Sequence, residues 1–198
     1  MKNDLYERLL ELREQAKSVG EPVLRDKSFE LLLKTVEKKQ PLKLLEIGVN
    51  RGLSGIGMLL SSPKATLAGI EIDEDKIKIA KGNYAEFGVE ERAKIFYGDA
   101  SEIIPVLTGE YDFIFLDGPK GHYYEYLPNL LAVLSKGGIL FADNVLFRGY
   151  VGGKVKTPHK FNTTKNSMER FLKAITTDNN LKTQIYEIED GVSITEKL

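Results

Sequence analysis

The feature that most constrains the fold is an alternation of short apolar runs with amphipathic segments. Each apolar run is followed at once by an acidic residue or a glycine. Continuous apolar runs bounded in this way are typical of strands buried on both faces of a parallel sheet. We therefore predict five parallel strands, over residues 42–47, 65–72, 93–97, 111–116 and 138–142.

The segment between the second and third runs has the period of an amphipathic helix. Apolar residues recur every three or four positions from Ile77 to Phe87, with Lys and Glu between them. Asp73 is placed to cap the start of this helix, and Gly88 to end it. Further helices are predicted over residues 4–19, 27–39 and 163–176.

The end of the chain changes character. Residues 182–189 and 192–196 flank the dipeptide Asp190-Gly191, which favours a type I′ turn between two antiparallel strands. The whole pattern predicts a doubly wound α/β sheet that ends in an antiparallel hairpin. Ligands of such sheets bind outside the carboxyl ends of the strands, so the chemistry is expected there.

Length and composition bound the organisation. A chain of 198 residues with 42% hydrophobic residues and no internal repeat predicts one domain over residues 1–198. Helices occupy its first part, residues 1–40, and the core occupies residues 41–198. No apolar run approaches the roughly 18 residues of a membrane span, and the first residues lack a signal peptide. We expect a cytoplasmic protein with no membrane partner.

Two compositional facts restrict the chemistry. The chain has no cysteine, which excludes disulfides, thiolate metal sites and a cysteine nucleophile. The net charge is only -1, yet residues 145–168 contain no Asp or Glu. This stretch, the basic segment, carries five positive charges, from Arg148, Lys154, Lys156, Lys160 and Lys165.

The end of the first predicted strand suggests a cofactor without a pyrophosphate. A dinucleotide fingerprint needs the spacing G-x-G-x-x-G, but Asn50 stands where its second glycine belongs. Gly48 and Gly52 still allow close approach to the backbone, and Glu46 could anchor the loop or attract a cation. These features suit a cofactor without phosphate, and S-adenosylmethionine is such a cofactor.

The next two strand ends carry acidic residues in the order that such a cofactor needs. Glu71 could accept hydrogen bonds from both ribose hydroxyls. Asp99 could accept the adenine amino group, and the backbone of Ala100 could meet the edge of the ring. Each acid alone is also a plausible helix N-cap.

The last two predicted parallel strands end in oxygen-bearing side chains. Asp117 follows one strand, and Asp143 and Asn144 follow the other. If the strands are neighbours, these side chains converge. Carboxylate and amide oxygens suit Mg²⁺, Mn²⁺ or Ca²⁺; the alternative is a capping Asp and a turn Asn. Neither His122 nor His159 is assigned to the metal.

Together these residues resemble class I S-adenosylmethionine-dependent methyltransferases, specifically the metal-dependent O-methyltransferases of catechol and caffeoyl-CoA. The resemblance covers about residues 20–198. It is carried by Glu46, Gly48, Gly52 and Ser54, by Glu71, by Gly98-Asp99-Ala100, by the run F-L-D-G-P-K-G at 115–121 and by A-D-N-V at 142–145.

The resemblance implies a Rossmann-like fold with a mostly parallel seven-stranded sheet and helices on both faces. It implies Lys120 as general base, and Asp117 in catalysis as well as in cofactor and metal binding. Glu46, Gly48, Ser54 and Leu24 would also bind the cofactor. It also implies a homodimer. For Tyr123, Tyr124 and Tyr126, packing at the start of a helix is favoured over stacking on a substrate.

The family chemistry requires an acceptor with two neighbouring oxygens. Residues 143–151 look most like bacterial enzymes that methylate 5-hydroxyuridine at the tRNA wobble position to 5-methoxyuridine. Catechol enzymes have an acid downstream of the Asp-Asn pair, which the basic segment lacks. Binding to tRNA phosphates through Arg148, Lys154, Lys156 and Lys160 is the leading hypothesis.

Three alternatives remain. The chain could methylate catechol-like or caffeoyl-CoA-like small molecules. It could be a cofactor-binding protein without catalysis, although Asp117, Lys120, Asp143 and Asn144 argue against this. The basic segment could also be no more than a solvated loop.

Overall fold

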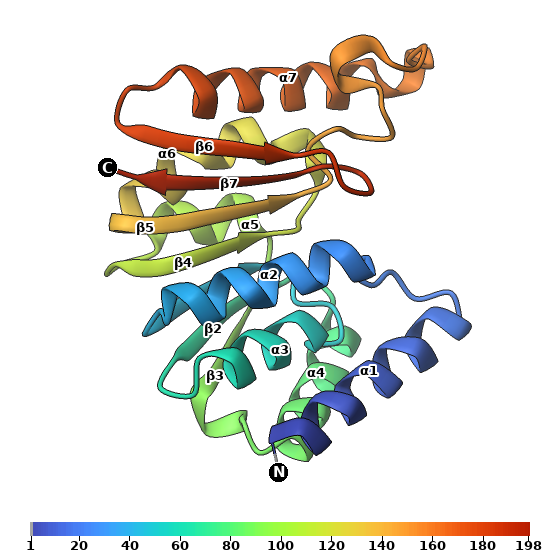
Figure 1. The fold of residues 1–198 in the computed structure, drawn as a ribbon, viewed down its shortest axis with the longest axis vertical. Helices are drawn as coiled ribbons and strands as arrows, with labels where there is room; N and C mark the ends of the chain where they lie inside the picture. Colours follow the sequence, from blue (N-terminus) through green and yellow to red (C-terminus); the bar gives the residue numbers. More distant parts are fainter. Residues whose placement is uncertain (1) are drawn as a thin grey trace. The chain divides into compact units, whose positions relative to one another are not determined.

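The structure, a computed structural model, describes residues 2–198 (Figure 1). The chain forms two compact units, Met1–Asp99 and Ala100–Leu198. In both units parallel strands are connected through helices, as the alternating pattern of the sequence predicts, and the second unit adds an antiparallel hairpin.

The first unit contains a three-stranded parallel sheet in the order β3-β2-β1. Helices α1 and α2 both contact α3. Strand β1 is buried from Leu44 onward, and the apolar side chains Leu44, Leu45 and Ile47 have no exposed surface, as is typical of an inner strand of a parallel sheet. The elements are α1 (Lys2–Ser18), α2 (Asp26–Lys39), β1 (Lys43–Ile47), α3 (Leu53–Ser61), β2 (Thr66–Glu71), α4 (Glu74–Glu86), η1 (Glu90–Arg92) and β3 (Ala93–Tyr97).

Helix α4 confirms the prediction made from its caps. The Asp73 carboxylate accepts the backbone N–H groups of Asp75 and Lys76, at 2.9 and 3.2 Å. Gly88 adopts a left-handed φ of 63° just beyond the helix. The Asp73 side chain thus fixes the start of this helix, and the left-handed backbone of Gly88 fixes its end.

The second unit contains β4 and β5 in parallel, followed by the antiparallel pairs β5·β7 and β7·β6. Phe113, Phe115 and Phe141 fill its core, and both phenylalanines of β4 contact the Phe141 ring. The elements are α5 (Ala100–Ile103), η2 (Ile104–Val106), β4 (Tyr111–Leu116), η3 (Lys120–His122), α6 (Tyr123–Val133), β5 (Leu134–Asp143), η4 (Val151–Gly153), η5 (His159–Phe161), α7 (Asn162–Thr177), β6 (Leu181–Tyr186) and β7 (Val192–Lys197).

The seven strands formed by residues 2–198 follow the order β3-β2-β1-β4-β5-β7-β6. Strand β7 is antiparallel to both of its neighbours, β5 and β6. The predicted Rossmann-like, mostly parallel sheet with a C-terminal antiparallel hairpin is thus confirmed. None of the helices within this described part of the chain has the length and hydropathy of a membrane span.

Two local predictions were wrong. Strand β5 begins at Leu134 rather than at residue 138, with an irregular register opposite Tyr111 and Phe113. The hairpin turn is not type I′, because Glu189 and Gly191 have positive φ and Asp190 does not. Contacts with a distant loop explain this turn.

Asp190 accepts hydrogen bonds from the loop after β5. Its carbonyl accepts the N–H of Leu146 at 2.9 Å, and its carboxylate accepts the N–H of Arg148. Gly191 (φ 83°) lies so close to Leu146 that an added Cβ would be 2.3 Å from Leu146 Cγ. The turn geometry thus depends on tertiary contacts, which override the local preference of the Asp-Gly dipeptide.

Candidate cofactor and acceptor sites

The loop between β1 and α3 owes its shape to a left-handed glycine. Gly52 has φ 76° and stands at the N-cap of α3. A Cβ at this position would lie 2.6 Å from Cε1 of Tyr84 on α4. Only glycine therefore permits both this backbone conformation and this close packing. Ser54 follows, half-buried in the first turn of α3.

Glu46 lies in the interior of the first unit. Its side chain has no exposed surface. A Cβ built on Gly55 of α3 would be 2.8 Å from Glu46 Oε2 and 2.7 Å from the Tyr84 hydroxyl. Burial, with the nearby Glu46 charge as a second cause, raises the pKa of Tyr84 well above its usual value. Glu46 of β1 thus lies close to both α3 and α4, and its two predicted roles stay predictions.

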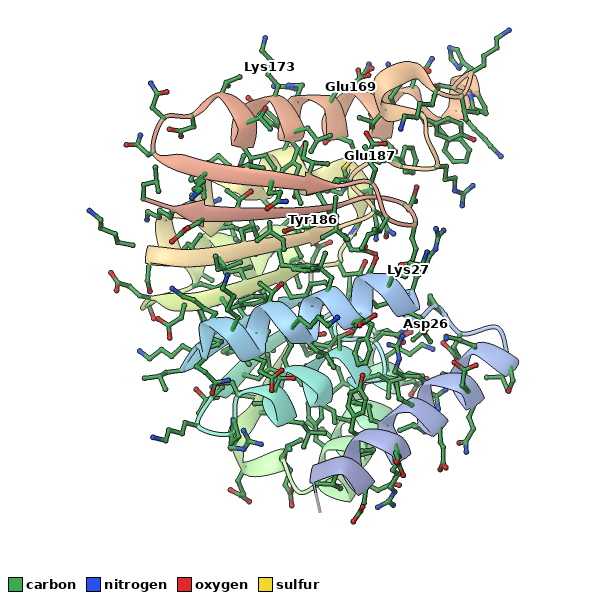
Figure 2. The ribbon with its side chains drawn as sticks, viewed as in Figure 1. Asp26, Lys27, Glu169, Lys173, Tyr186 and Glu187 are labelled. Atoms are coloured by element: carbon green, nitrogen blue, oxygen red, sulfur yellow. The ribbon has the colours of Figure 1, made fainter. Side chains whose placement is uncertain are left out.

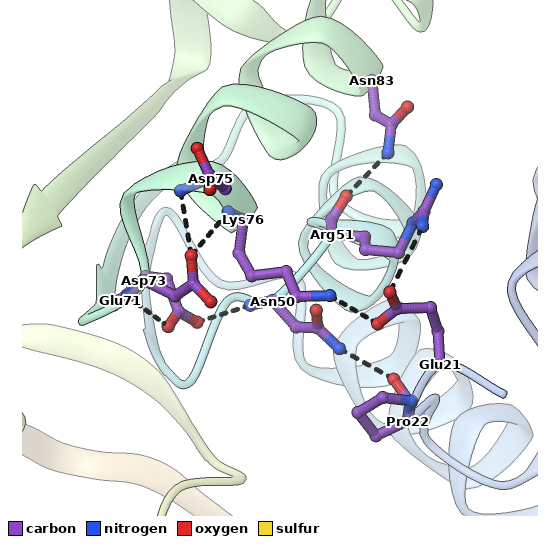
Figure 3. A network of polar contacts seen from close by, with 9 residues as sticks. All are labelled: Glu21, Pro22, Asn50, Arg51, Glu71, Asp73, Asp75, Lys76 and Asn83. Atoms are coloured by element: carbon purple, nitrogen blue, oxygen red, sulfur yellow. Dashed lines mark hydrogen bonds and ion pairs between the residues drawn. The ribbon is translucent and has the colours of Figure 1, made fainter.

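Glu71 is held firmly at the carboxyl end of β2. Its Oε2 accepts the backbone N–H of Asn50 at 2.7 Å (Figure 3). Its Oε1 accepts the N–H groups of Ile72 and Asp73, at 2.9 and 3.0 Å. These bonds fill three of the about four lone-pair positions of a carboxylate. Glu71 is therefore oriented in advance, with about one position left for a ligand hydroxyl.

The other predicted cofactor residues of the first unit differ in exposure. Asp99 follows β3 and is exposed. Leu24 lies in the connection between α1 and α2, and its side chain is buried. Its carbonyl accepts a hydrogen bond from the buried Arg13 guanidinium at 2.6 Å. Arg13 also pairs with Asp26, which lies at the start of α2 (Figure 2).

In the second unit, the structure brings the predicted metal ligands together. Leu116 of β4 pairs with Ala142 of β5, so Asp117 and Asp143 both stand one residue beyond the same pair. Neighbouring strands lie about 4.8 Å apart. Asp143 is buried, and Asn144 adopts a left-handed φ of 57° as the chain leaves the strand. Three oxygen-bearing side chains thus share one edge of the sheet.

The possible metal ligands at this edge of the sheet are not all of the residue types His, Cys, Asp and Glu. Among residues 2–198, no group of three or more His, Cys, Asp and Glu side chains is arranged to hold a metal ion. The edge has two carboxylates and one amide, and the amide does not belong to those residue types. A metal site here would therefore rest on a mixed donor set.

Lys120 stands on η3, directly after β4. Its Nζ lies 2.7 Å from Asp117 Oδ1, and about a quarter of each side chain is exposed (23% and 26%). The short turn thus places an amine beside the predicted metal ligands. Residue Ala100, the remaining predicted cofactor contact, is half-buried at the start of α5 in the same unit.

Tyr123 connects the two strand ends. Its fully buried hydroxyl can donate to the carbonyl of Leu116 at 3.0 Å or of Asp143 at 3.3 Å. Burial raises the pKa of Tyr123 well above its usual value. Tyr126 is buried as well, so packing rather than substrate stacking is confirmed for these two residues. Tyr124 instead lies beneath the Arg170 guanidinium.

The loop after β5 carries an aromatic cluster, formed by Phe147, Tyr150 and Phe161. Neighbouring ring centroids are 5.5 to 5.7 Å apart. Arg148 and Lys160 lie 5.4 and 5.0 Å from the Phe161 centroid. The basic segment therefore combines cations with aromatic rings, an association that the sequence analysis did not identify.

Part of the charge of the basic segment is neutralised by ion pairs. Lys154 pairs with Glu187, which follows β6 (Figure 2), at 2.6 Å. Lys165 pairs with Glu169 on α7 at 2.8 Å. Both pairs are within reach of solvent and stabilise the fold little. Arg148 and Lys160 contact the aromatic cluster, and Lys156 is exposed.

The fold and these strand ends define a Rossmann-like enzyme with polar groups at the carboxyl edge of its sheet. The sequence model of the O-methyltransferase family matches residues 5–198. The chain therefore belongs to the O-methyltransferase family. The prediction of an S-adenosylmethionine-dependent O-methyltransferase is confirmed.

Individual relatives agree with this assignment. A caffeoyl-CoA O-methyltransferase of Populus kitakamiensis is 28% identical, over 98% of this chain and 87% of the relative. The catechol O-methyltransferase of Sus scrofa is 33% identical, over 69% and 75%. The SAH-bound crystal structure of the Podospora anserina methyltransferase PaMTH1 is 24% identical, with a TM-score of 0.84 and coverage of 96% and 87%. The predicted likeness to tRNA enzymes stays a prediction.

Proposed function

We propose that the protein is a divalent-metal-dependent O-methyltransferase that methylates one of two neighbouring hydroxyls on a catechol-like or caffeoyl-CoA-like small molecule. The observation that carries this proposal is the group Asp117, Lys120, Asp143 and Asn144 at the carboxyl ends of β4 and β5. The caffeoyl-CoA and catechol enzymes among the relatives favour this class of acceptor.

The cofactor is proposed to bind at the strand ends that the sequence singles out. When bound, S-adenosylmethionine supplies a methyl group on a positively charged sulfur. Glu71 would bind a ribose hydroxyl, since its carboxylate is already oriented by three backbone N–H groups. The other proposed contacts are Leu24, Gly48, Ser54, Asp99, Ala100 and Asp117, with Glu46 anchoring the loop from inside.

The donor set fits a hard divalent cation. Asp117, Asp143 and Asn144 offer only oxygen ligands, which Mg²⁺, Mn²⁺ and Ca²⁺ prefer. A cation held by these three residues would still have room for water and for two neighbouring acceptor oxygens. When bound, the cation would supply positive charge that stabilises the acceptor oxygen as it loses its proton.

Lys120 is proposed as the general base. Its Nζ, after release of its own proton, would accept the proton of the acceptor hydroxyl. The deprotonated acceptor oxygen would then be ready to receive the methyl group that S-adenosylmethionine supplies when bound. The step needs no protein nucleophile, in keeping with the absence of cysteine.

A second acceptor, 5-hydroxyuridine at the wobble position of tRNA, is favoured by one observation. The aromatic cluster of Phe147, Tyr150 and Phe161, with Arg148 and Lys160 beside it, combines ring faces with positive charge. Unpaired bases of RNA loops stack on such rings, and cations bind the phosphates. The 5-hydroxyl and 4-carbonyl of this base also offer two neighbouring oxygens.

The direct test supplies labelled S-adenosylmethionine and Mg²⁺ with catechol, caffeoyl-CoA or tRNA that lacks the modification. We expect label in a small-molecule acceptor, at least 100-fold less after EDTA treatment, and recovery when Mg²⁺ is restored. Label in tRNA alone would shift the assignment to the second acceptor. Transfer that is unchanged by EDTA would contradict the metal proposal, and Asn144→Ala provides an independent check of the donor set.

Charge reversal separates the two acceptors. If tRNA is the acceptor, reversing three lysines of the basic segment should weaken tRNA binding by at least about 100-fold at low salt, because phosphate contacts are lost. Turnover of catechol should not change. The variant carries Lys154→Glu, Lys156→Glu and Lys160→Glu; a control with the same net charge carries Lys64→Glu, Lys81→Glu and Lys94→Glu, all exposed in the first unit. Equal tRNA binding by both variants would remove the support for an RNA acceptor.

A further inference from the structure

The connection between α1 and α2, residues 19–25, is tied to the loop that follows β1. The Asn50 side-chain amide donates to the carbonyl of Pro22 at 2.8 Å (Figure 3). Glu21 in the same connection accepts a hydrogen bond from Lys76 of α4 at 2.5 Å. Arg51 lies 3.8 Å from the same carboxylate. Residues 19–25 are thus held by polar contacts from two other segments of the first unit.

The main chain of Asn50 makes a second contact. Its backbone N–H donates to Glu71 Oε2 at 2.7 Å. The backbone of Asn50 is left-handed, with φ 48°. Asparagine is one of the few residues with a side chain that adopts this conformation readily. One residue therefore contacts both Glu71 and the α1–α2 connection.

The surroundings keep both contacts in place. The Asn83 side chain on α4 donates to the carbonyl of Arg51 at 2.8 Å, which fixes the next peptide of the loop. Only about a quarter of each side chain of the ion pair between Glu21 and Lys76 is exposed (23% and 25%). This ion pair is therefore better shielded from water than the surface pairs of α2 and α4.

We infer that Asn50 is a positioning residue that couples cofactor binding at Glu71 to closure of residues 19–25. This inference rests on the proposed role of Glu71. A ligand that fixes Glu71 also fixes the peptide of Asn50, and the Asn50 side chain then holds Pro22. Coupling of this kind is reciprocal, so loss of the contact with Pro22 weakens binding of the ligand at Glu71.

The test uses two substitutions that remove the same contact by different means. Asn50→Asp keeps the shape but cannot donate to Pro22 while ionised. Asn50→Gly keeps the left-handed backbone and the N–H to Glu71 but removes the side chain. The matched control is Gln40→Gly, because Gln40 also has φ 48° and its amide also donates to backbone carbonyls, those of Glu37 and Ser61.

Two quantities are measured in the full chain: the Kd of S-adenosylhomocysteine by calorimetry, and hydrogen exchange of peptides from residues 19–25. In the unsubstituted protein, S-adenosylhomocysteine is expected to slow this exchange. Both Asn50 variants should bind about 3- to 10-fold more weakly, as for loss of one hydrogen bond, and should lose the ligand-induced protection. Gln40→Gly should resemble the unsubstituted protein.

The outcomes distinguish this inference from the proposed cofactor site. Glu71→Ala should weaken S-adenosylhomocysteine binding; if it does not, the cofactor site is wrong and the inference falls with it. If Glu71→Ala weakens binding while both Asn50 variants behave normally, only the inference is overturned. An effect in Asn50→Asp alone would show charge repulsion and would also overturn it.

A further variant covers failure of the Asn50 proteins to fold. Lys76→Met removes the ion pair with Glu21 and leaves the loop after β1 intact. It should accelerate hydrogen exchange of residues 19–25 and weaken the binding of S-adenosylhomocysteine, as the Asn50 variants do. Unchanged exchange in this variant would contradict the coupling.

Discussion

Lys120→Met is expected to lower kcat by about 10²- to 10⁴-fold, the range for loss of a general base. The affinity for S-adenosylhomocysteine should stay within about twofold, because a general base acts on the proton of the acceptor hydroxyl and is not needed to bind the cofactor. Lys120 contacts Asp117 at 2.7 Å and stands on the turn directly after β4. Initial rates with the acceptor that the labelling test identifies, together with calorimetry, measure both effects.

Lys120→Arg separates base catalysis from charge. Arginine keeps the positive charge and can still pair with Asp117, but it does not give up its proton in proteins. If Lys120 is the base, this variant should be nearly as inactive as Lys120→Met. Activity retained with arginine would instead assign Lys120 an electrostatic role. Lys136→Met, an exposed residue near the amino end of β5, should leave kcat unchanged.

The sequence predicted those elements whose signals are local. Strand β4 begins and ends where its apolar run does, and α4 is fixed by Asp73 at one end and Gly88 at the other. The grouping of Asp117 with Asp143 could also be predicted, because both directly follow buried runs and parallel strands end at the same edge of a sheet.

Features that depend on distant contacts could not be predicted in this way. The hairpin turn takes its shape from Leu146 and Arg148, more than forty residues before it. In the sequence, Asn50 is unusual only because it interrupts a dinucleotide fingerprint. Its hydrogen bonds to Pro22 and Glu71 join residues that are 28 and 21 positions apart. An asparagine at the position where that fingerprint has its second glycine is the one local signal that could have singled it out.

The aromatic cluster was missed for a related reason. Phe147 and Tyr150 are close in sequence, but Phe161 joins them only because the loop folds back. Counting charges in the basic segment also overstated its positive potential, since Lys154 and Lys165 are each paired with a glutamate. Sequence reasoning identified the segment, and the structure shows which of its cations accompany rings.

Gly52→Ala is expected to lower the free energy of unfolding by about 2–5 kcal/mol. A left-handed alanine costs about 1–2 kcal/mol, and overpacking of a filled core adds about 1–3 kcal/mol. The added methyl would lie 2.6 Å from Tyr84 Cε1 and 3.2 Å from Ala80 Cβ. Tyr84 is almost fully buried, so its ring cannot swing into solvent. Urea denaturation of the substituted and unsubstituted proteins measures the change.

Gly82→Ala is the matched control, and it should change stability in the opposite direction. Gly82 is exposed on α4, and a Cβ there meets nothing within 4 Å, so alanine should stabilise the helix by about 0.5–1 kcal/mol. The double variant with Tyr84→Leu separates the two causes at Gly52. If the ring contact contributes, Gly52→Ala should cost at least about 0.5 kcal/mol less in the Tyr84→Leu background. Equal costs in both backgrounds would assign the whole effect to the backbone conformation.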